Sequence, residues 1–106
     1  MEWLEPWCNV DDFGPEFAAF FEAELRRELS DGHPLFGRPV AAIGKRDGTD
    51  DVLFRLLDGT GRVAVVHLTF SNRPESPPWP GCRIFPSLEI WASDCMRADH
   101  DDFQEG

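Results

Sequence analysis

The sequence predicts an α+β fold in which one N-terminal amphipathic helix packs on a four-stranded, mainly antiparallel sheet. The strongest observation is the run of residues 62–70, Arg-Val-Ala-Val-Val-His-Leu-Thr-Phe, which is rich in β-branched and aromatic residues. Two Asp-Gly turns separate this run from two earlier β-like runs. Between residues 15 and 30, apolar residues recur at steps of three and four, which is the period of a helix face.

Length and composition favour a single globular domain that spans residues 1–106. The chain has 106 residues and a hydrophobic share of 42%, enough for one core. No apolar run approaches the length of about 20 residues that a membrane helix needs, and the acidic start is unlike a signal peptide, so a cytoplasmic location is expected. Cys8, Cys82 and Cys95 lack a CxxC pair, which argues against a disulfide framework or a zinc ribbon.

The first 30 residues are expected to form an arm and a helix. Residues 1–14 carry Trp3 and Trp7 among acids, and we expect this arm to lay its aromatic rings on the domain. Pro15 suits the first turn of a helix that extends to about Ser30. The apolar stripe of this helix is predicted to be core rather than a ligand site. It consists of Phe17, Phe20, Phe21, Leu25 and Leu29.

Four strands are predicted at residues 40–46, 51–57, 62–70 and 83–92, joined as a meander. Pro86 inside the last of them indicates an edge position or a bulge. Residues 71–82 form a proline-rich loop that carries Trp79. A short helix is expected around residues 94–102, and it overlaps an acidic tail, residues 98–106.

The third predicted strand has apolar residues on both faces. Because one helix covers only one face, the second face needs another cover: the N-terminal arm, the C-terminal segment or another subunit. Alternation places Ala64, Val66, Leu68 and Phe70 on one face and Val63, Val65, His67 and Thr69 on the other.

The net charge of -10 is concentrated at the two ends of the chain. Residues 1–25 contain seven acids and no Lys or Arg, and residues 98–106 contain four more acids without a basic residue. Nucleic-acid binding requires clustered Lys and Arg, so we expect no nucleic acid and no membrane as partners. The acidic ends would steer a basic partner, whereas the simpler interpretation is a solvated, solubilising surface.

Motifs for catalysis, metal binding and nucleotide binding are weak. No Gly-x-Ser-x-Gly is present, and Cys82 and His67 are only a loose pair on either side of the proline-rich loop. Adjacent residues in the stretch 99–102 do not point at one ion, and residues 47–51 suit a turn better than a calcium loop. Gly59 and Gly61 precede a strand, so they form no phosphate cradle. We therefore predict no catalytic residue, metal or cofactor.

What remains is a mixed polar and aromatic surface on the second sheet face, rimmed by the loop with Trp79. Trp, His and Arg are residue types that anchor protein interfaces. The competing interpretation is that the arm or the C-terminal segment packs there instead. The candidate surface comprises Arg55, His67, Thr69, Trp79, Phe85, Glu89 and Trp91.

Two functional hypotheses follow from this surface. The first is a non-enzymatic protein-binding module with a basic protein partner, or a homodimer that pairs through Val63 and Val65. The second is a small-molecule binder or enzyme, with a pocket lined by His67, Arg55, Glu89 and Trp91.

Four short motifs in this sequence are similar to segments of other proteins. They are His-Pro-Leu-Phe-Gly at residues 33–37, Asp-Asp-Val-Leu-Phe at 50–54, Val-Val-His-Leu-Thr-Phe at 65–70 and Trp-Pro at 79–80. The chain resembles a group of small bacterial proteins with no assigned function, which implies a stand-alone bacterial cytoplasmic domain. In size and charge it is also similar to immunity proteins that neutralise toxins, which implies an inhibitor of a basic partner.

Overall fold

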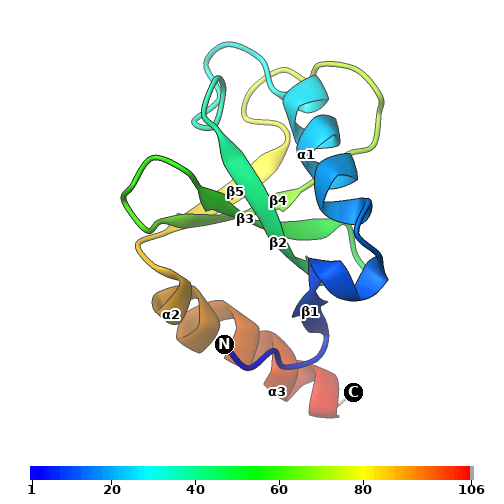
Figure 1. The fold of residues 1–106 in the computed structure, drawn as a ribbon, viewed down its shortest axis with the longest axis vertical. Coiled ribbons are helices and arrows are strands. Elements are labelled where there is room, and N and C mark those ends of the chain that lie inside the picture. The colour runs from blue at the N-terminus through cyan, green and yellow to red at the C-terminus, as the bar shows by residue number, and fades with distance from the viewer. Residues whose placement is uncertain (106) are drawn as a thin grey trace.

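The computed structural model describes residues 1–105 and shows a five-stranded sheet with helices on both faces (Figure 1). Every pair of neighbouring strands is antiparallel and the spatial order follows the chain, which confirms the predicted α+β meander. The sheet has one strand more than predicted, because part of the N-terminal arm pairs with its edge. The strands are β1 (Trp7–Asn9), β2 (Val40–Arg46), β3 (Asp51–Leu56), β4 (Val63–His67) and β5 (Gly81–Phe85).

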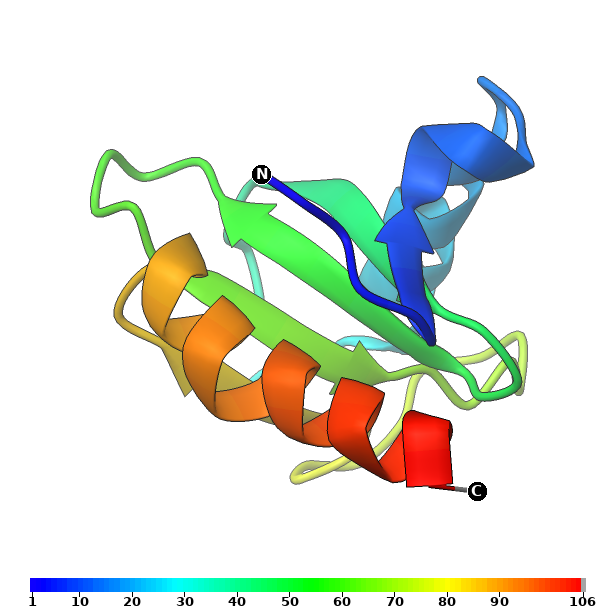
Figure 2. The same ribbon diagram turned by 90° about the horizontal axis from the view of Figure 1, so that it is seen from below.

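The helices form two layers, one on each side of the sheet. The helix α1 lies against one face, and α2, η2 and α3 follow one another as a single rod on the opposite side (Figures 1 and 2). Figure 2 shows the N-terminal arm running beside this rod. The helical segments are η1 (Val10–Phe13), α1 (Phe17–Glu28), α2 (Leu88–Trp91), η2 (Ala92–Met96) and α3 (Arg97–Glu105).

The fourth predicted strand, residues 83–92, is wrong in its second half. The strand ends at Phe85, and Pro86, which lacks a backbone N–H, separates it from a helix. The Ser87 side chain accepts a hydrogen bond from the backbone N–H of Ile90, which makes Ser87 the N-cap of α2. The short apolar run therefore belongs to a helix start, which its alternation alone does not distinguish from a strand.

The α1 face of the sheet carries the first core. Ala64, Val66 and Leu68 are buried there, as the alternation predicts, whereas Phe70, predicted for the same face, is 37% exposed because β4 ends at His67. Phe21 and Leu25 on α1 are buried, but Phe20 is 51% exposed, so its prediction as a core residue is wrong. Adjacent residues on a helix point about 100° apart, and Phe21 takes the inward direction. The buried members are Val10, Phe21, Leu25, Leu29, Leu35, Ala42, Val52, Phe54, Leu56, Ala64, Val66 and Leu68.

The second face is covered by both the arm and the C-terminal rod. The Trp7 and Trp91 rings meet edge to face with centroids 5.0 Å apart, and Trp7 Nε1 donates to Asp99 Oδ2 at 2.8 Å. A Cβ added at Gly44 would lie 2.6 Å from the Trp3 ring, so glycine there makes room for the arm. The buried members of this core are Trp7, Leu53, Val63, Phe85, Trp91, Cys95 and Met96.

The loop between β4 and β5 is irregular, as predicted, and is fastened by the segment after α1. Buried His33 accepts the N–H of Leu35 at Nδ1, so its Nε2–H donates to the carbonyl of Pro80 at 2.8 Å. The backbone N–H of Glu75 donates to the carbonyl of Glu28 at 2.9 Å. His33 in the His-Pro-Leu-Phe-Gly motif therefore has a structural role: its hydrogen bond holds the loop to the segment after α1.

The predicted acidic tail is mostly helical. Residues 97–105 belong to α3, whereas Gly106, the last residue of the predicted tail, lies outside the described residues. Among residues 1–105 no helix is long and apolar enough to cross a membrane.

Candidate functional site

The seven residues predicted to form one surface do not lie together. Phe85 and Trp91 belong to the second core, and Trp91 is fully buried. This part of the prediction is wrong, because the C-terminal segment is a helix that turns Trp91 toward the sheet. Val63, proposed as a homodimer contact, is covered in the same way.

The remaining members fall into separate regions. Arg55 and Glu89 line two adjoining hollows beside the N-terminal arm. Thr69 follows β4, where its backbone N–H donates to the Glu28 carboxylate on α1. Trp79 stands on the proline-rich loop with an exposed ring.

His67 lies at the end of β4 and pairs with an acid of β3. Its Nδ1 is 3.0 Å from Asp51 Oδ1, and the Thr49 hydroxyl donates to Asp51 Oδ2 at 2.9 Å. The two side chains line an open hollow of about 340 Å³ together with Val65, Gly81, Cys82 and Arg83. This arrangement orients an exposed imidazole at the sheet surface.

Cys82 does not complete a nucleophile with His67. It pairs with Val66 across the sheet and packs against the first core, whereas His67 pairs with Gly81 one position along and faces the other side. Burial raises the pKa of the Cys82 thiol, so the reactive thiolate is disfavoured. Both residues border the same hollow, but their side chains leave neighbouring strands on opposite faces of the sheet, which does not suit a Cys-His mechanism.

Among residues 1–105, no group of three His, Cys, Asp or Glu side chains is placed to hold a metal ion. In the stretch 99–102, Asp99 accepts from the Trp7 indole and His100 Nδ1–H donates to the carbonyl of Glu5 at 2.7 Å. These two side chains therefore tie α3 to the arm.

Exposed aromatic side chains gather instead along α1. Phe13 at the end of η1 contacts Phe17 with ring centroids 6.0 Å apart, and Phe17 contacts Phe20 at 6.4 Å. Phe20 stacks on Phe70 with centroids 6.2 Å apart and planes 15° from parallel. We call Phe13, Phe17, Phe20 and Phe70 the aromatic ridge. Phe13, Phe20 and Phe70 are 41%, 51% and 37% exposed, so the ridge faces solvent.

A buried carboxylate on α1 holds the Phe70 end of the ridge. The Glu28 oxygens accept hydrogen bonds from the backbone N–H groups of Thr69 and Phe70, both at 2.9 Å. Phe70 has φ of 53°, a left-handed conformation that a bulky residue adopts rarely. The two hydrogen bonds fix this conformation, which places the Phe70 ring against Phe20.

Glu28 and its neighbour Glu24 are both buried on α1. Burial raises the pKa of Glu28, and Glu24 raises it further, while the N–H groups of Thr69 and Phe70 oppose the shift. Glu24 Oε1 is 2.5 Å from the Arg27 guanidinium, which also donates to Asn72 Oδ1 at 2.8 Å. The base of the ridge is therefore a hydrogen-bonded cluster that links α1 to the loop after β4.

The other end of the ridge is acidic. Phe13 lines a hollow of about 280 Å³ together with Glu5, Asp12 and Asp47. The pKa of the Cys8 thiol in this hollow is raised, first by burial and then by Asp12, Asp47 and Glu5, with Lys45 opposing them. Glu5, Asp12 and Asp47 therefore concentrate negative charge beside the Phe13 end of the ridge.

The aromatic stripe of α1, predicted to be core, is only partly buried, and neither Phe13 nor Phe70 is among the residues predicted for a binding surface. One signal was present: Phe20 and Phe21 are neighbours, so a helix cannot turn both toward one sheet. Glu24 and Glu28, three and seven residues after the buried Phe21, were also a sign that the inward face meets a polar partner.

No protein-family model matches this sequence, and comparisons with curated proteins and with solved structures found no match. The resemblance to small bacterial proteins therefore stays a prediction.

Proposed function

We propose that this chain is a non-enzymatic protein-binding module that receives a basic, amphipathic segment of its partner on the aromatic ridge. The observation that carries this proposal is the exposure of Phe13, Phe20 and Phe70 in one row of touching rings. Large aromatic side chains are the usual anchors of protein interfaces.

The ridge is suited to binding because it is rigid before a partner arrives. Phe13 and Phe17 border η1 and α1, and Glu28 fixes the backbone of Phe70. An interface that is already ordered loses little conformational entropy on association, which favours affinity.

The charge beside the ridge favours a basic partner. Glu5, Asp12 and Asp47 line the hollow that Phe13 shares. Lys or Arg side chains on the partner would meet these carboxylates at the rim, which speeds association and makes it sensitive to salt. An immunity-type inhibitor of a basic protein is one form that such a module takes.

The alternative, a small-molecule binder or enzyme around His67, has less support. The Asp51–His67 pair orients an imidazole, but Cys82 faces the other side of the sheet and Trp91 is buried. Homodimerisation through Val63 and Val65 also has less support, because Val63 is buried and only Val65 borders an open hollow. A second copy docked on the ridge itself is the remaining form of a homodimer.

The test is a fluorescence-anisotropy titration with a labelled amphipathic peptide that carries leucine on one helical face and lysine on the other. We expect Phe20→Ala to weaken binding by about 10-fold or more, the size of an anchor residue, and added salt to weaken the wild type. Phe36→Ala is the matched control, because Phe36 is 50% exposed but lies outside the ridge.

A second peptide with glutamate in place of lysine separates charge from apolar contact, and light scattering reports self-association. The proposal fails if Phe20→Ala and Phe36→Ala bind the lysine peptide equally well, or if the glutamate peptide binds as tightly. A wild-type dimer that Phe20→Ala converts to a monomer would assign the ridge to a second copy instead.

A further inference from the structure

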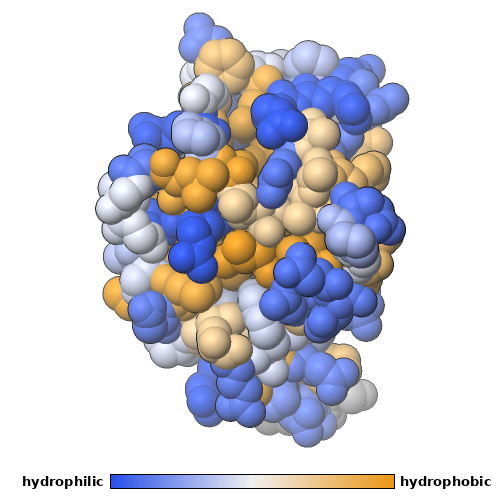
Figure 3. Space-filling view, viewed as in Figure 1, coloured by the Kyte–Doolittle hydropathy of each residue, from blue (hydrophilic) through white to orange (hydrophobic). Residues whose placement is uncertain are grey.

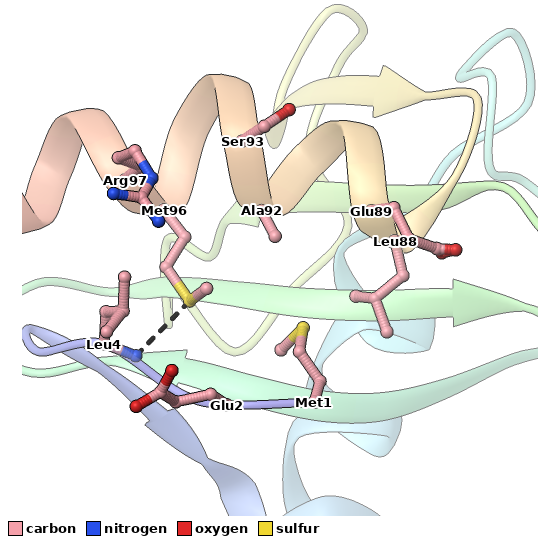
Figure 4. A pocket seen from close by; sticks show the side chains of 9 residues that line it. All are labelled: Met1, Glu2, Leu4, Leu88, Glu89, Ala92, Ser93, Met96 and Arg97. Carbon is pink, nitrogen blue, oxygen red and sulfur yellow. Dashed lines mark hydrogen bonds between the residues drawn. The ribbon is translucent and has the colours of Figure 1, made fainter.

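A separate apolar groove lies on the opposite side of the molecule, between the N-terminal arm and the C-terminal rod (Figure 4). Its volume is about 500 Å³, within the range of small-molecule sites. Figure 3 shows hydrophobic side chains reaching the surface across the middle of the molecule, in the band between the sheet and the C-terminal rod. The apolar lining residues are Met1, Leu4, Leu88, Ala92 and Met96.

The walls of the groove combine a fixed contact with adaptable side chains. The backbone N–H of Leu4 lies 3.5 Å from the sulfur of Met96, a contact that joins the arm to the rod (Figure 4). Met1 and Leu88 extend toward each other farther along the groove (Figure 4). Methionine side chains adapt to irregular apolar ligands, so two of them in one groove favour an apolar guest.

The rod changes its helical geometry where it forms the groove wall. The backbone N–H of Arg97 donates to the carbonyl of Ala92, five residues earlier, so η2 is a π-helical turn between α2 and α3. Turns of this type are rare and occur often at functional sites. Ala92, Ser93 and Met96 belong to this turn and line the groove.

The rim of the groove is more acidic than basic. The charged lining residues are two carboxylates, Glu2 and Glu89, and one guanidinium, that of Arg97. An adjoining hollow of about 290 Å³ carries Arg55 and Asp11, one base and one acid. Since the whole chain also has a net charge of -10, its field favours a cation at this rim.

We propose that this groove binds an apolar molecule with one positive charge, such as an alkylamine or a quaternary ammonium compound. Its hydrocarbon part lies between Leu4, Leu88 and Met96, and its cationic head lies at one end of the groove, beside Glu2 or beside Glu89, which stand at opposite ends (Figure 4). This site is distinct from the aromatic ridge and independent of it.

The test uses three probes with the same ten-carbon chain: decyltrimethylammonium, decanol and decanoate. Each is titrated below its critical micelle concentration, and binding is followed by calorimetry and by the fluorescence of the tryptophans. We expect decyltrimethylammonium to bind tightest and decanoate weakest, with a ratio of about fivefold to tenfold for a pair of charges at a solvated rim. Glu2→Gln with Glu89→Gln should remove most of this ratio and leave decanol binding unchanged.

Ala92→Trp should abolish binding of all three probes by filling the groove, and Ala19→Trp on the exposed side of α1 is the matched control. If Ala92→Trp fails to fold, Ser93→Trp at the rim serves the same purpose. The inference is overturned if no probe binds, if decanoate binds as tightly as decyltrimethylammonium, or if a folded groove-filling variant binds like the wild type.

Discussion

The two aromatic clusters of this protein are built alike but lie in opposite environments. Trp7 and Trp91 meet edge to face in the second core, with Trp3 beside them. The aromatic ridge likewise joins segments distant in sequence, since Phe70 stacks on Phe20, yet its rings face solvent. One cluster is part of the folded core, and the other remains available.

The difference arises from what lies above each cluster. The tryptophans lie between the sheet and the C-terminal rod, and the polar end of Trp7 is satisfied by Asp99. The ridge lies on the outer side of α1, where no element among residues 1–105 covers Phe20. Aromatic content alone therefore does not distinguish core residues from exposed ones; the position of the covering element does.

The largest expected loss of stability comes from a substitution in the tryptophan cluster. Trp91→Ala should lower the free energy of unfolding by about 3–5 kcal/mol, because it removes a fully buried ring. Trp79→Ala, at an exposed position on the loop, should change it by about 0.5 kcal/mol or less. Urea unfolding of both variants checks this, and equal losses would contradict the assignment of Trp91 to the core.

The second prediction compares neighbours on α1. Phe21→Ala should cost about 3–5 kcal/mol of unfolding free energy, whereas Phe20→Ala should cost about 1 kcal/mol or less, because only Phe21 is buried. The same urea experiment measures both. A large loss in Phe20→Ala would show that the ridge supports the fold rather than a partner.

A smaller effect is expected where the arm joins the tryptophan cluster. Gly44→Ala places a Cβ about 2.6 Å from the Trp3 ring, so the arm must shift, at a cost of about 1–3 kcal/mol. A change in Trp fluorescence together with the stability loss would locate the shift at the arm. Gly48→Ala tests general glycine effects, because open space surrounds Gly48, although its φ of 84° adds strain.

The smallest effect is a pH dependence at the base of the ridge. Glu28 has a raised pKa, so between its ordinary value of 4.5 and the raised value the folded state holds more protons than the unfolded state. The Glu28 contribution to stability is therefore present below pH 4.5 and lost as pH rises through the raised pKa. The stability of the wild type should fall relative to that of Glu28→Gln over this window, measured by urea unfolding at several pH values. A wild type that gains stability relative to Glu28→Gln over the same window would contradict the raised pKa.

Much of the fold was predictable because it rests on local signals. The Asp-Gly turns and the alternation in residues 62–70 predicted β2 to β4 and the two faces of the sheet. The change from strand β5 to helix α2 was not predictable from the sequence, because five residues around Pro86 are too few to show a period. The pairing of β1 with β2 was missed because three residues of an edge strand carry no alternation of their own.

The candidate site was less predictable than the fold. The surface proposed from the sequence assumed that residues 83–92 form a strand, and the helix at Leu88 buried Trp91 instead. The ridge depends on the contact between Phe20 and Phe70, fifty residues apart, and on Glu28, which reaches the backbone of Phe70. Such contacts follow from tertiary structure and leave no pattern within a short window of sequence.

The most direct test of the central claim, that the aromatic ridge is a binding surface outside the folded core, is urea unfolding with and without the leucine–lysine peptide. At a peptide concentration about 100 times its dissociation constant, the wild type should gain about 2.7 kcal/mol of stability. Without peptide, the stability of Phe20→Ala should lie within about 1 kcal/mol of that of the wild type. Because its binding is expected to be about 10-fold weaker, Phe20→Ala should gain about 1.4 kcal/mol or less from the same peptide concentration. An equal gain in both proteins, or a Phe20→Ala variant as unstable as Phe21→Ala, would contradict the claim.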